Sequence, residues 1–189
     1  MKTILDLCGG TGAWSKPYKD AGYDVRLVTL PEQDVRLYIP PENVHGILAA
    51  PPCTHFAAAG APSWKKKGDK ELLEGLSIVD ACLRIIQVCQ PKWWVLENPV
   101  GRLRRWIGPP RMMFNPCDYG DPYTKKTCLW GNFKEPKKNP VEPIFIVDKR
   151  GRRDSSLHYN SFRLPKEQRA VVRSITPAGF AKAFFEANP

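Results

Sequence analysis

The chain opens on an apolar segment, residues 3–7, that runs directly into a glycine-rich turn at residues 8–12. Glycines let the backbone turn sharply and approach a ligand closely, and a following helix would present free N–H groups there. We therefore predict a strand, a turn and a helix to about Ala21, then, after Gly22, a second strand at residues 24–29. This order is typical of a parallel α/β sheet, which binds its ligand at the carboxyl ends of the strands.

Later segments continue the alternation of strands and helices. The apolar positions between Glu71 and Cys89 follow helical spacing. Residues 61–69 contain Pro, Gly and three consecutive lysines, and we expect them to form a mobile basic loop. Thr176 can cap a C-terminal helix, and Pro177 suits its first turn. The other expected elements are strands at 46–50 and 93–96 and short strands near 127–130 and 144–147.

Length and charge limit the class of protein. The chain has 189 residues, enough for one good core, and we expect a single domain over residues 1–189. Its apolar stretches fall far short of the roughly 20 residues that span a bilayer. Asp6 lies where a signal peptide would be apolar, so we expect a cytoplasmic protein with no membrane partner, possible as a monomer.

The net charge is +10, and the basic residues cluster. This favours a polyanionic partner such as nucleic acid, although the charge would also serve solubility alone. The clusters lie at residues 65–67, 102–105, 125–126, 137–138 and 149–153.

The six cysteines form no C-x-x-C pair, so no zinc or other metal site is predicted, and an intracellular chain is not expected to form disulfides. Cys82 and Cys89 share one face of the expected helix and suit small buried positions. Cys53 differs, because it follows Pro51 and Pro52 at the end of an expected buried strand. A lone cysteine is more often structural, but this stiff context favours a nucleophile at the carboxyl end of the sheet.

Glu97 ends the apolar segment at residues 93–96, where a carboxylate is costly unless it has a partner. It lies 44 positions after Cys53, with one long helix between them, so their strands are expected to be neighbours. Glu97 could then share a cleft with Cys53 and hydrogen-bond the edge of a base. The alternative is a helix-capping or solvated glutamate.

The glycine turn reads G-G-x-G, which differs from the G-x-G-x-x-G of dinucleotide sites, and no lysine follows it as in a P-loop. These differences disfavour dinucleotides and nucleoside triphosphates and leave S-adenosylmethionine (SAM) as a candidate ligand. The alternative is a glycine turn needed only for packing.

The glycine turn, the Pro52-Cys53 segment and Glu97-Asn98 follow one another along the chain in the order of the motifs of the DNA cytosine-5 methyltransferase family. The chain resembles the short form of this family that is found in phages and prophages. The resemblance covers most of the chain and includes Tyr119 to Pro122 with Lys125 and Lys126. It implies the Rossmann-like fold of class I SAM-dependent methyltransferases, SAM as methyl donor, and double-stranded DNA as partner. It implies catalytic roles for Cys53, Glu97, Asn98 and Lys125. The implied SAM-binding residues are Asp6, Cys8, Gly9, Gly10, Gly12, Trp14, Glu32, Asp34, Pro51 and Ser174.

The resemblance also implies a mechanism. A cytosine is flipped out of the DNA stack, Cys53 attacks C6, and Glu97 holds N3 and the exocyclic amine. C5 then accepts the methyl group, and loss of its proton releases Cys53. Lys125 or Lys126 would supply positive charge near the base or its phosphate. Asp34 resembles the residue that contacts the adenine amino group, and residues 174–177 resemble the motif that closes over SAM.

The chain departs from the family pattern at several positions. Cys8 occupies a position where the family often has an aromatic residue, and Glu32 lies one position later than the usual ribose-binding acid. Only about 45 residues separate Lys126 from the last motif, so residues 131–172 would form a reduced recognition region with short or relaxed sequence specificity. Arg150, Arg152 and Arg153 are expected to contact mainly phosphates there.

Two alternatives remain open from the sequence. The first is the same chemistry on RNA or single-stranded DNA. The second is a protein that binds SAM or nucleic acid without turnover.

Overall fold

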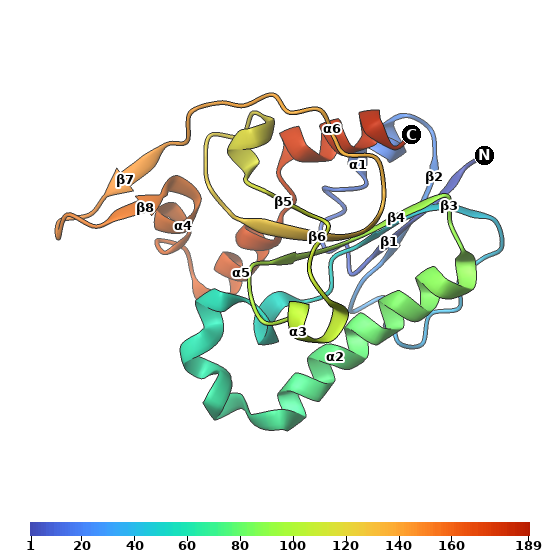
Figure 1. The fold of residues 1–189 in the computed structure, drawn as a ribbon, viewed down its shortest axis with the longest axis horizontal. Helices are drawn as coiled ribbons and strands as arrows, with labels where there is room; N and C mark the ends of the chain where they lie inside the picture. The colour runs from blue at the N-terminus through green and yellow to red at the C-terminus, as the bar shows by residue number, and fades with distance from the viewer.

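The computed structural model describes the backbone of residues 1–189 and every side chain except those at positions 63, 65–67 and 166. A six-stranded sheet runs through the molecule in the order β2-β1-β3-β4-β6-β5 (Figure 1). β1 to β4 pair in parallel, whereas β6 is antiparallel to both β4 and β5. The strands are β1 (Thr3–Leu7), β2 (Asp24–Val28), β3 (Val44–Ala49), β4 (Trp93–Pro99), β5 (Met112–Phe114) and β6 (Thr127–Asn132). The predicted α/β fold with a mostly parallel sheet is confirmed.

Helices cover both faces of the sheet (Figure 1). α2 (Trp64–Cys89) and α3 (Arg104–Ile107) lie on one face, and α1 (Lys16–Asp20) and α6 (Ala178–Ala187) lie on the other. Alternate residues of each central strand therefore enter different cores: Leu5 packs with the residues of α2, and Ile4 packs with those of α6. A strand buried on both sides is apolar throughout, which explains why β1 and β3 are recognisable as continuous apolar runs.

The helix expected at residues 71–89 is present but begins earlier, at Trp64. The prediction of a loop at residues 61–69 is wrong, because the short helix η2 (Ala58–Ser63) leads directly into α2. Gly68 has φ 67° and ψ −172°, a backbone conformation outside the helical region that glycine adopts readily. The chain therefore bends at Gly68 between two helical segments, and it does not form a loop there. The lysine side chains at 65–67 in the predicted basic cluster lie outside the described residues.

The C-terminal helix is present, but the prediction that Thr176 caps it is wrong. Pro177 occupies the N-cap position of α6, where it provides no side-chain hydrogen bond to the first turn of the helix. The Gly179 N–H instead donates to Asp121 Oδ2 at 2.9 Å, and Tyr119 O lies 1.9 Å from where a Gly179 Cβ would stand. This helix start is therefore stabilised by a distant turn, η3 (Pro116–Tyr119), and the residues that follow it.

Between β6 and α6 the chain forms a hairpin that projects from the body of the molecule (Figure 1). The hairpin pairs β7 (Phe145–Val147) with β8 (Arg153–Ser155) and leads into α4 (Ser156–Ser161) and α5 (Lys166–Ser174). The short strand expected near 144–147 is confirmed as β7, whereas β8, α4 and α5 had no sequence prediction. Among the described residues, no helix is both long enough and apolar enough to cross a membrane.

Candidate active site

Three parallel strands end side by side at one edge of the sheet. In their register, Leu7 of β1 lies beside Ala49 of β3, and Ala49 lies beside Leu96 of β4. The segments that continue these strands therefore start from one row: the glycine turn, the Pro51-Pro52-Cys53 segment, and Glu97 with Asn98. The sheet topology thus brings together residues that are up to about 90 positions apart in the sequence.

The predicted nucleophile lies on a tight turn at the surface. Cys53 is exposed and begins the short helix η1 (Cys53–His55), directly after Pro52. Its carbonyl oxygen accepts hydrogen bonds from the N–H groups of Phe56 and Ala57, both at 2.9 Å. A buried strand followed by two prolines thus delivers a cysteine to solvent, where a substrate can reach it.

Glu97 lies in β4, opposite Leu129 of β6. Burial raises the pKa of its carboxyl group, and the nearby Lys125 ammonium opposes this by lowering the pKa. Both residues line a narrow pocket whose volume of about 10 Å³ leaves room for roughly one water molecule. A base can therefore enter only if the surrounding side chains move. The other lining residues are Trp14, Phe114, Thr127, Thr176, Pro177 and Phe180.

Asn98 connects the glutamate strand to the cysteine segment. It is fully buried, and its Nδ2 donates a hydrogen bond of 2.9 Å to the carbonyl oxygen of Pro51. Asn98 Oδ1 is also buried and has no hydrogen-bond partner among the described residues. The amide therefore holds the proline turn against the end of β4, a contact that positions Cys53 relative to Glu97.

The glycine turn is built over a buried carboxyl group. Asp6 is fully buried, and its Oδ2 accepts a hydrogen bond of 2.5 Å from Ser15 Oγ. A Cβ at Gly9 would lie 2.3 Å from Asp6 Cγ, so only glycine fits at this position. Gly10 and Gly12 have φ of 54° and 69°, in the left-handed region that favours glycine. Asp6 Oδ1 is buried without a described partner, which marks this turn as a polar cradle.

Burial raises the pKa of Asp6 from 3.8 to about 6, despite the Ser15 hydrogen bond. Between pH 3.8 and about 6, the Asp6 carboxyl group therefore keeps its proton in the folded protein but has lost it in the unfolded chain. The contribution of Asp6 to the free energy of unfolding is therefore greatest at low pH. It is lost as the pH rises through about 6, and the loss is at most about 3 kcal/mol.

We expect Asp6→Asn to remove this part of the pH dependence, because the amide cannot ionise. Urea unfolding at pH 5 and pH 8 checks the prediction: the variant should lose less stability between the two values than the wild type does. Asp20→Asn is the matched control, because Asp20 is exposed and forms a surface ion pair with Lys16. An unchanged pH dependence in Asp6→Asn would contradict the assignment.

A second pocket, of about 110 Å³, lies between the glycine turn and the loop after β2. It contains two of the predicted SAM-binding residues, Cys8 and Asp34, and Pro52 from the nucleophile segment also lines it. Its walls are mainly apolar, which suits a planar ring with a polar edge. The remaining lining residues are Val28, Thr29, Leu30, Gln33, Val35, Arg36 and Ile78.

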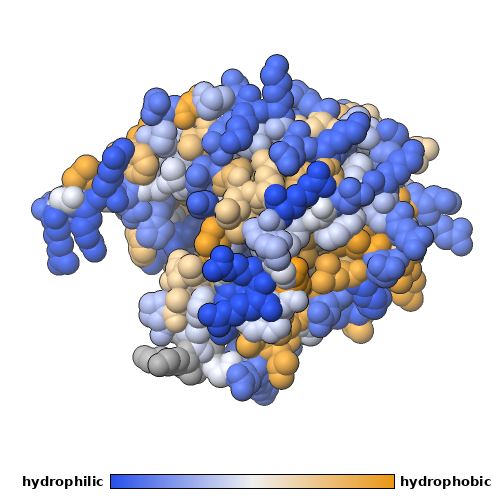
Figure 2. Space-filling view, viewed as in Figure 1, coloured by the Kyte–Doolittle hydropathy of each residue, from blue (hydrophilic) through white to orange (hydrophobic). Residues whose placement is uncertain are grey.

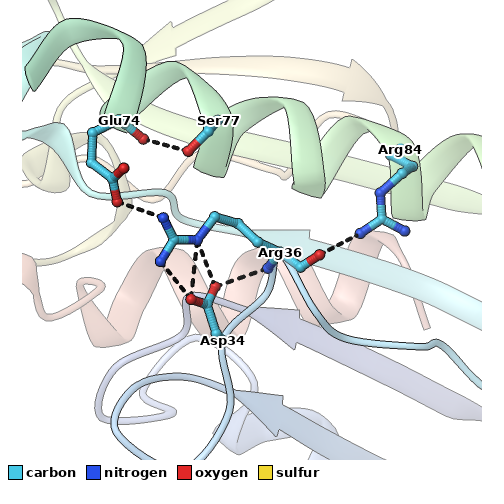
Figure 3. A network of polar contacts seen from close by, with 5 residues as sticks. All are labelled: Asp34, Arg36, Glu74, Ser77 and Arg84. Carbon is cyan, nitrogen blue, oxygen red and sulfur yellow. Dashed lines mark hydrogen bonds and ion pairs between the residues drawn. The ribbon is translucent and has the colours of Figure 1, made fainter. Parts of the chain in front are cut away.

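Asp34 belongs to a polar network whose centre is Arg36 (Figure 3). Its carboxylate accepts hydrogen bonds from Arg36 Nε at 3.0 Å and from the Arg36 backbone N–H at 2.9 Å, and the Arg36 guanidinium holds the pKa of Asp34 below its ordinary value. Arg36 also pairs with Glu74 of α2 at 2.5 Å, and its carbonyl oxygen accepts from Arg84. The network ties the loop to α2 and keeps Asp34 ionised, so it can still accept a hydrogen bond from an amine.

Eight predicted SAM-binding residues do not line this pocket: Asp6, Gly9, Gly10, Gly12, Trp14, Glu32, Pro51 and Ser174. Glu32 is exposed in the loop after β2 and does not line the pocket. Ser174 is exposed at the end of α5, and its hydroxyl donates to Val171 O at 2.8 Å. Trp14 is buried against Phe180 and Phe184 and lines the Glu97 pocket instead.

The sequence predictions missed Arg36, Thr127 and Phe180. The Asp-x-Arg spacing at positions 34 and 36 could have indicated the first. Thr127 and Phe180 join the Glu97 pocket through β6 and α6, and no local pattern indicates that.

No protein-family model matches the sequence. The chain is 32% identical over 150 residues to a protein of Frog virus 3 (isolate Goorha) named "Probable DNA (cytosine-5)-methyltransferase", covering 67% of this chain and 69% of that protein. Its fold resembles a crystal structure of an E. coli protein encoded within a prophage and described as a "putative DNA modification methyltransferase". That similarity has a TM-score of 0.51 at 17% identity and covers 76% of this chain. The chain spans about half of the prophage protein, 53% of its length.

Proposed function

Because the chain belongs to the DNA (cytosine-5)-methyltransferase family, we propose that it transfers a methyl group from SAM to C5 of cytosine in DNA, with Cys53 as the nucleophile. The observation that carries the proposal is the meeting of the glycine turn, Cys53 and Glu97 at one edge of the sheet. The Asn98 to Pro51 hydrogen bond ties two of these segments together.

The residues at this edge suit SAM as the donor. The polar cradle over Asp6 and the apolar pocket at Cys8 and Asp34 offer places for a charged amino acid end and for a planar adenine. Asp34 would accept a hydrogen bond from the adenine amine. When bound, SAM would supply an electrophilic methyl group; Pro52, which lines this pocket, directly precedes Cys53 in the sequence.

The proposed reaction begins when the Cys53 thiolate adds to C6 of a cytosine that has been flipped from the stack. Electron density then moves toward N3, which becomes more basic. Glu97, whose raised pKa favours its protonated form, donates a proton or hydrogen bond to N3, and C5 becomes nucleophilic. When C5 takes the methyl group, the demethylated donor would leave with the electron pair of the broken S–CH3 bond. A solvent base would then remove the C5 proton, the C6–S bond would break to restore the thiolate, and the N3 proton would return to Glu97.

We propose that the projecting hairpin contacts the DNA backbone. The turn between its strands carries Lys149, Arg150 and Arg152, and Arg153 begins β8. Figure 2 shows many hydrophilic residues at this end of the molecule, with some hydrophobic ones among them. A pocket of about 620 Å³ between the hairpin and the region of α4 is lined by arginine and aromatic side chains as well as Asp148 and Asp154. Its other lining residues are Arg152, Arg153, His158, Tyr159, Phe162 and Arg163.

We expect the double variant Arg150→Ala/Arg153→Ala to weaken binding of any DNA duplex and to lower the slope of log K against log salt by about 2. Each arginine would release counterions when it neutralises a phosphate. Fluorescence anisotropy with a labelled duplex at several salt concentrations measures the slope. Lys182→Ala on α6 is the control, because it removes an exposed charge from a different surface. An unchanged slope in the double variant would exclude the hairpin from the interface.

The function itself is tested by methyl transfer from labelled SAM to duplex DNA, single-stranded DNA and tRNA. Incorporation into duplex DNA, at cytosines located by bisulfite sequencing, is the expected result. Incorporation into tRNA or single-stranded DNA alone would replace the proposed substrate, and no incorporation into any of them would leave a binding protein without turnover.

A further inference from the structure

The chain that continues from β4 runs along the nucleophile segment. Two backbone hydrogen bonds of 2.9 Å join them, from Ala58 N–H to Val100 O and from Arg102 N–H to Phe56 O. Ala57 and Gly101 form a bridge between the two segments. A Cβ at Gly101 would lie 1.9 Å from Phe56 O, so this close approach requires glycine.

The side chain of Arg102 adds a third connection. Its Nε donates a hydrogen bond of 2.7 Å to the carbonyl oxygen of His55. Its guanidinium carbon lies 4.5 Å from the ring centre of Trp64 and 5.9 Å from that of Trp106. Two tryptophan rings, one at the start of α2 and one in α3, therefore restrict the guanidinium while it holds the His55 carbonyl.

The opposite side of the segment packs on α2. A Cβ at Gly75 would lie 3.1 Å from both His55 Cδ2 and Phe56 Cζ, so the two residues press closely on this helix. Phe56 is fully buried and its ring contacts Trp106 edge-on at 6.3 Å. The turn that begins at Cys53 is thus held between α2 and the segment of Arg102.

We propose that Arg102 is a positioning residue for Cys53. The inference rests on the proposed function and deepens it, because Arg102 lies five residues after Glu97 on the same continuous segment. The segment that supplies the glutamate in β4 thus continues, after the strand ends, into the residue that orients the nucleophile. Arg102 does not contact the reacting atoms; it acts through the His55 carbonyl and the backbone of the turn.

Loss of this side chain leaves the turn with fewer constraints and lowers the fraction of molecules whose thiol faces C6 correctly. We expect Arg102→Ala to reduce the rate of covalent trapping by 5-fluorocytosine DNA about 10- to 100-fold, because small misplacements of a reacting group cost that much. The KM for SAM should stay unchanged, since Arg102 does not line the pocket of Cys8 and Asp34. Arg102→Lys keeps the charge but not the planar fork, so it should restore the rate only partly.

A merely structural role predicts a different result. If Arg102 only stabilised the fold, a smaller fraction of the Arg102→Ala protein would be folded, and that fraction would react at the wild-type rate. The amount of covalent complex formed would then fall, while the rate constant of its formation would not change. Arg105→Ala is the matched control, because Arg105 is an exposed cation of α3 close to Arg102 in sequence. Wild-type trapping rates in Arg102→Ala, or equal slowing in Arg105→Ala, would overturn the proposal.

Hydrogen–deuterium exchange separates this inference from the proposed function. The amides of Phe56, Ala57 and Ala58 should exchange about tenfold faster in Arg102→Ala than in Arg105→Ala, whether or not methyl transfer occurs. Absence of methyl transfer by the wild type would reject the proposed function, whereas unchanged exchange at these amides would reject the clamp.

Discussion

Replacing Cys53 with serine is expected to abolish methyl transfer and covalent trapping, lowering the rate by at least about 10³-fold. A serine hydroxyl is hardly ionised near neutral pH and is a much weaker nucleophile toward C6 than a thiolate. Transfer from labelled SAM to DNA and gel-shifted complexes with 5-fluorocytosine DNA both measure the loss. Binding of SAM should persist, because the pocket of Cys8 and Asp34 does not contain the Cys53 side chain.

The control for this prediction is Cys117→Ser, which changes a thiol of η3 outside the candidate site. It should retain activity and trapping. If Cys53→Ser and the wild type behave alike in both assays, Cys53 is not the nucleophile, and the chain would instead be a binding protein.

Replacing Glu97 with glutamine is expected to lower kcat about 10²- to 10³-fold with little effect on the KM for SAM. The amide preserves the shape of the side chain but cannot deliver a proton to N3. Burial holds the pKa of Glu97 above its ordinary value, so the protonated fraction, and with it the wild-type rate, falls as pH rises through that pKa. The Glu97→Gln variant should therefore lack the fall in kcat at high pH, the limb of the profile that loss of the Glu97 proton produces.

Lys125 provides a second check on Glu97. Its charge lowers the Glu97 pKa, so Lys125→Ala should move the Glu97 limb of the profile to higher pH. Glu186→Gln, which alters an exposed glutamate of α6, should leave both rate and profile unchanged. A Glu97→Gln enzyme with the wild-type pH profile would show that another group supplies the proton.

Much of the sheet could be predicted because its strands are buried on both faces. Leu5 and Ile47 enter the core beneath α2, whereas Ile4 and Leu48 enter the core beneath α6, so the strands appear as uninterrupted apolar runs. The hairpin of β7 and β8 has few buried residues, and only its first strand carried a recognisable pattern. The helical start of α2 was missed because Gly68 and Pro62 have the composition of a loop, while contacts such as Arg102 on Trp64 form only in the folded chain.

The sequence by itself determined the strand-ending motifs: a glycine turn after β1, a cysteine after two prolines beyond β3, and a glutamate at the end of β4. Each is local, because a few neighbouring residues set the backbone of a turn or the end of a strand. Only the tertiary structure decided how the motifs are joined. The Asn98 to Pro51 bond, the clamp of Arg102 on His55 and the narrow pocket around Glu97 all unite residues from different elements. Such contacts depend on which strands are neighbours and how their side chains pack, and that information lies in the folded sheet rather than in any single segment.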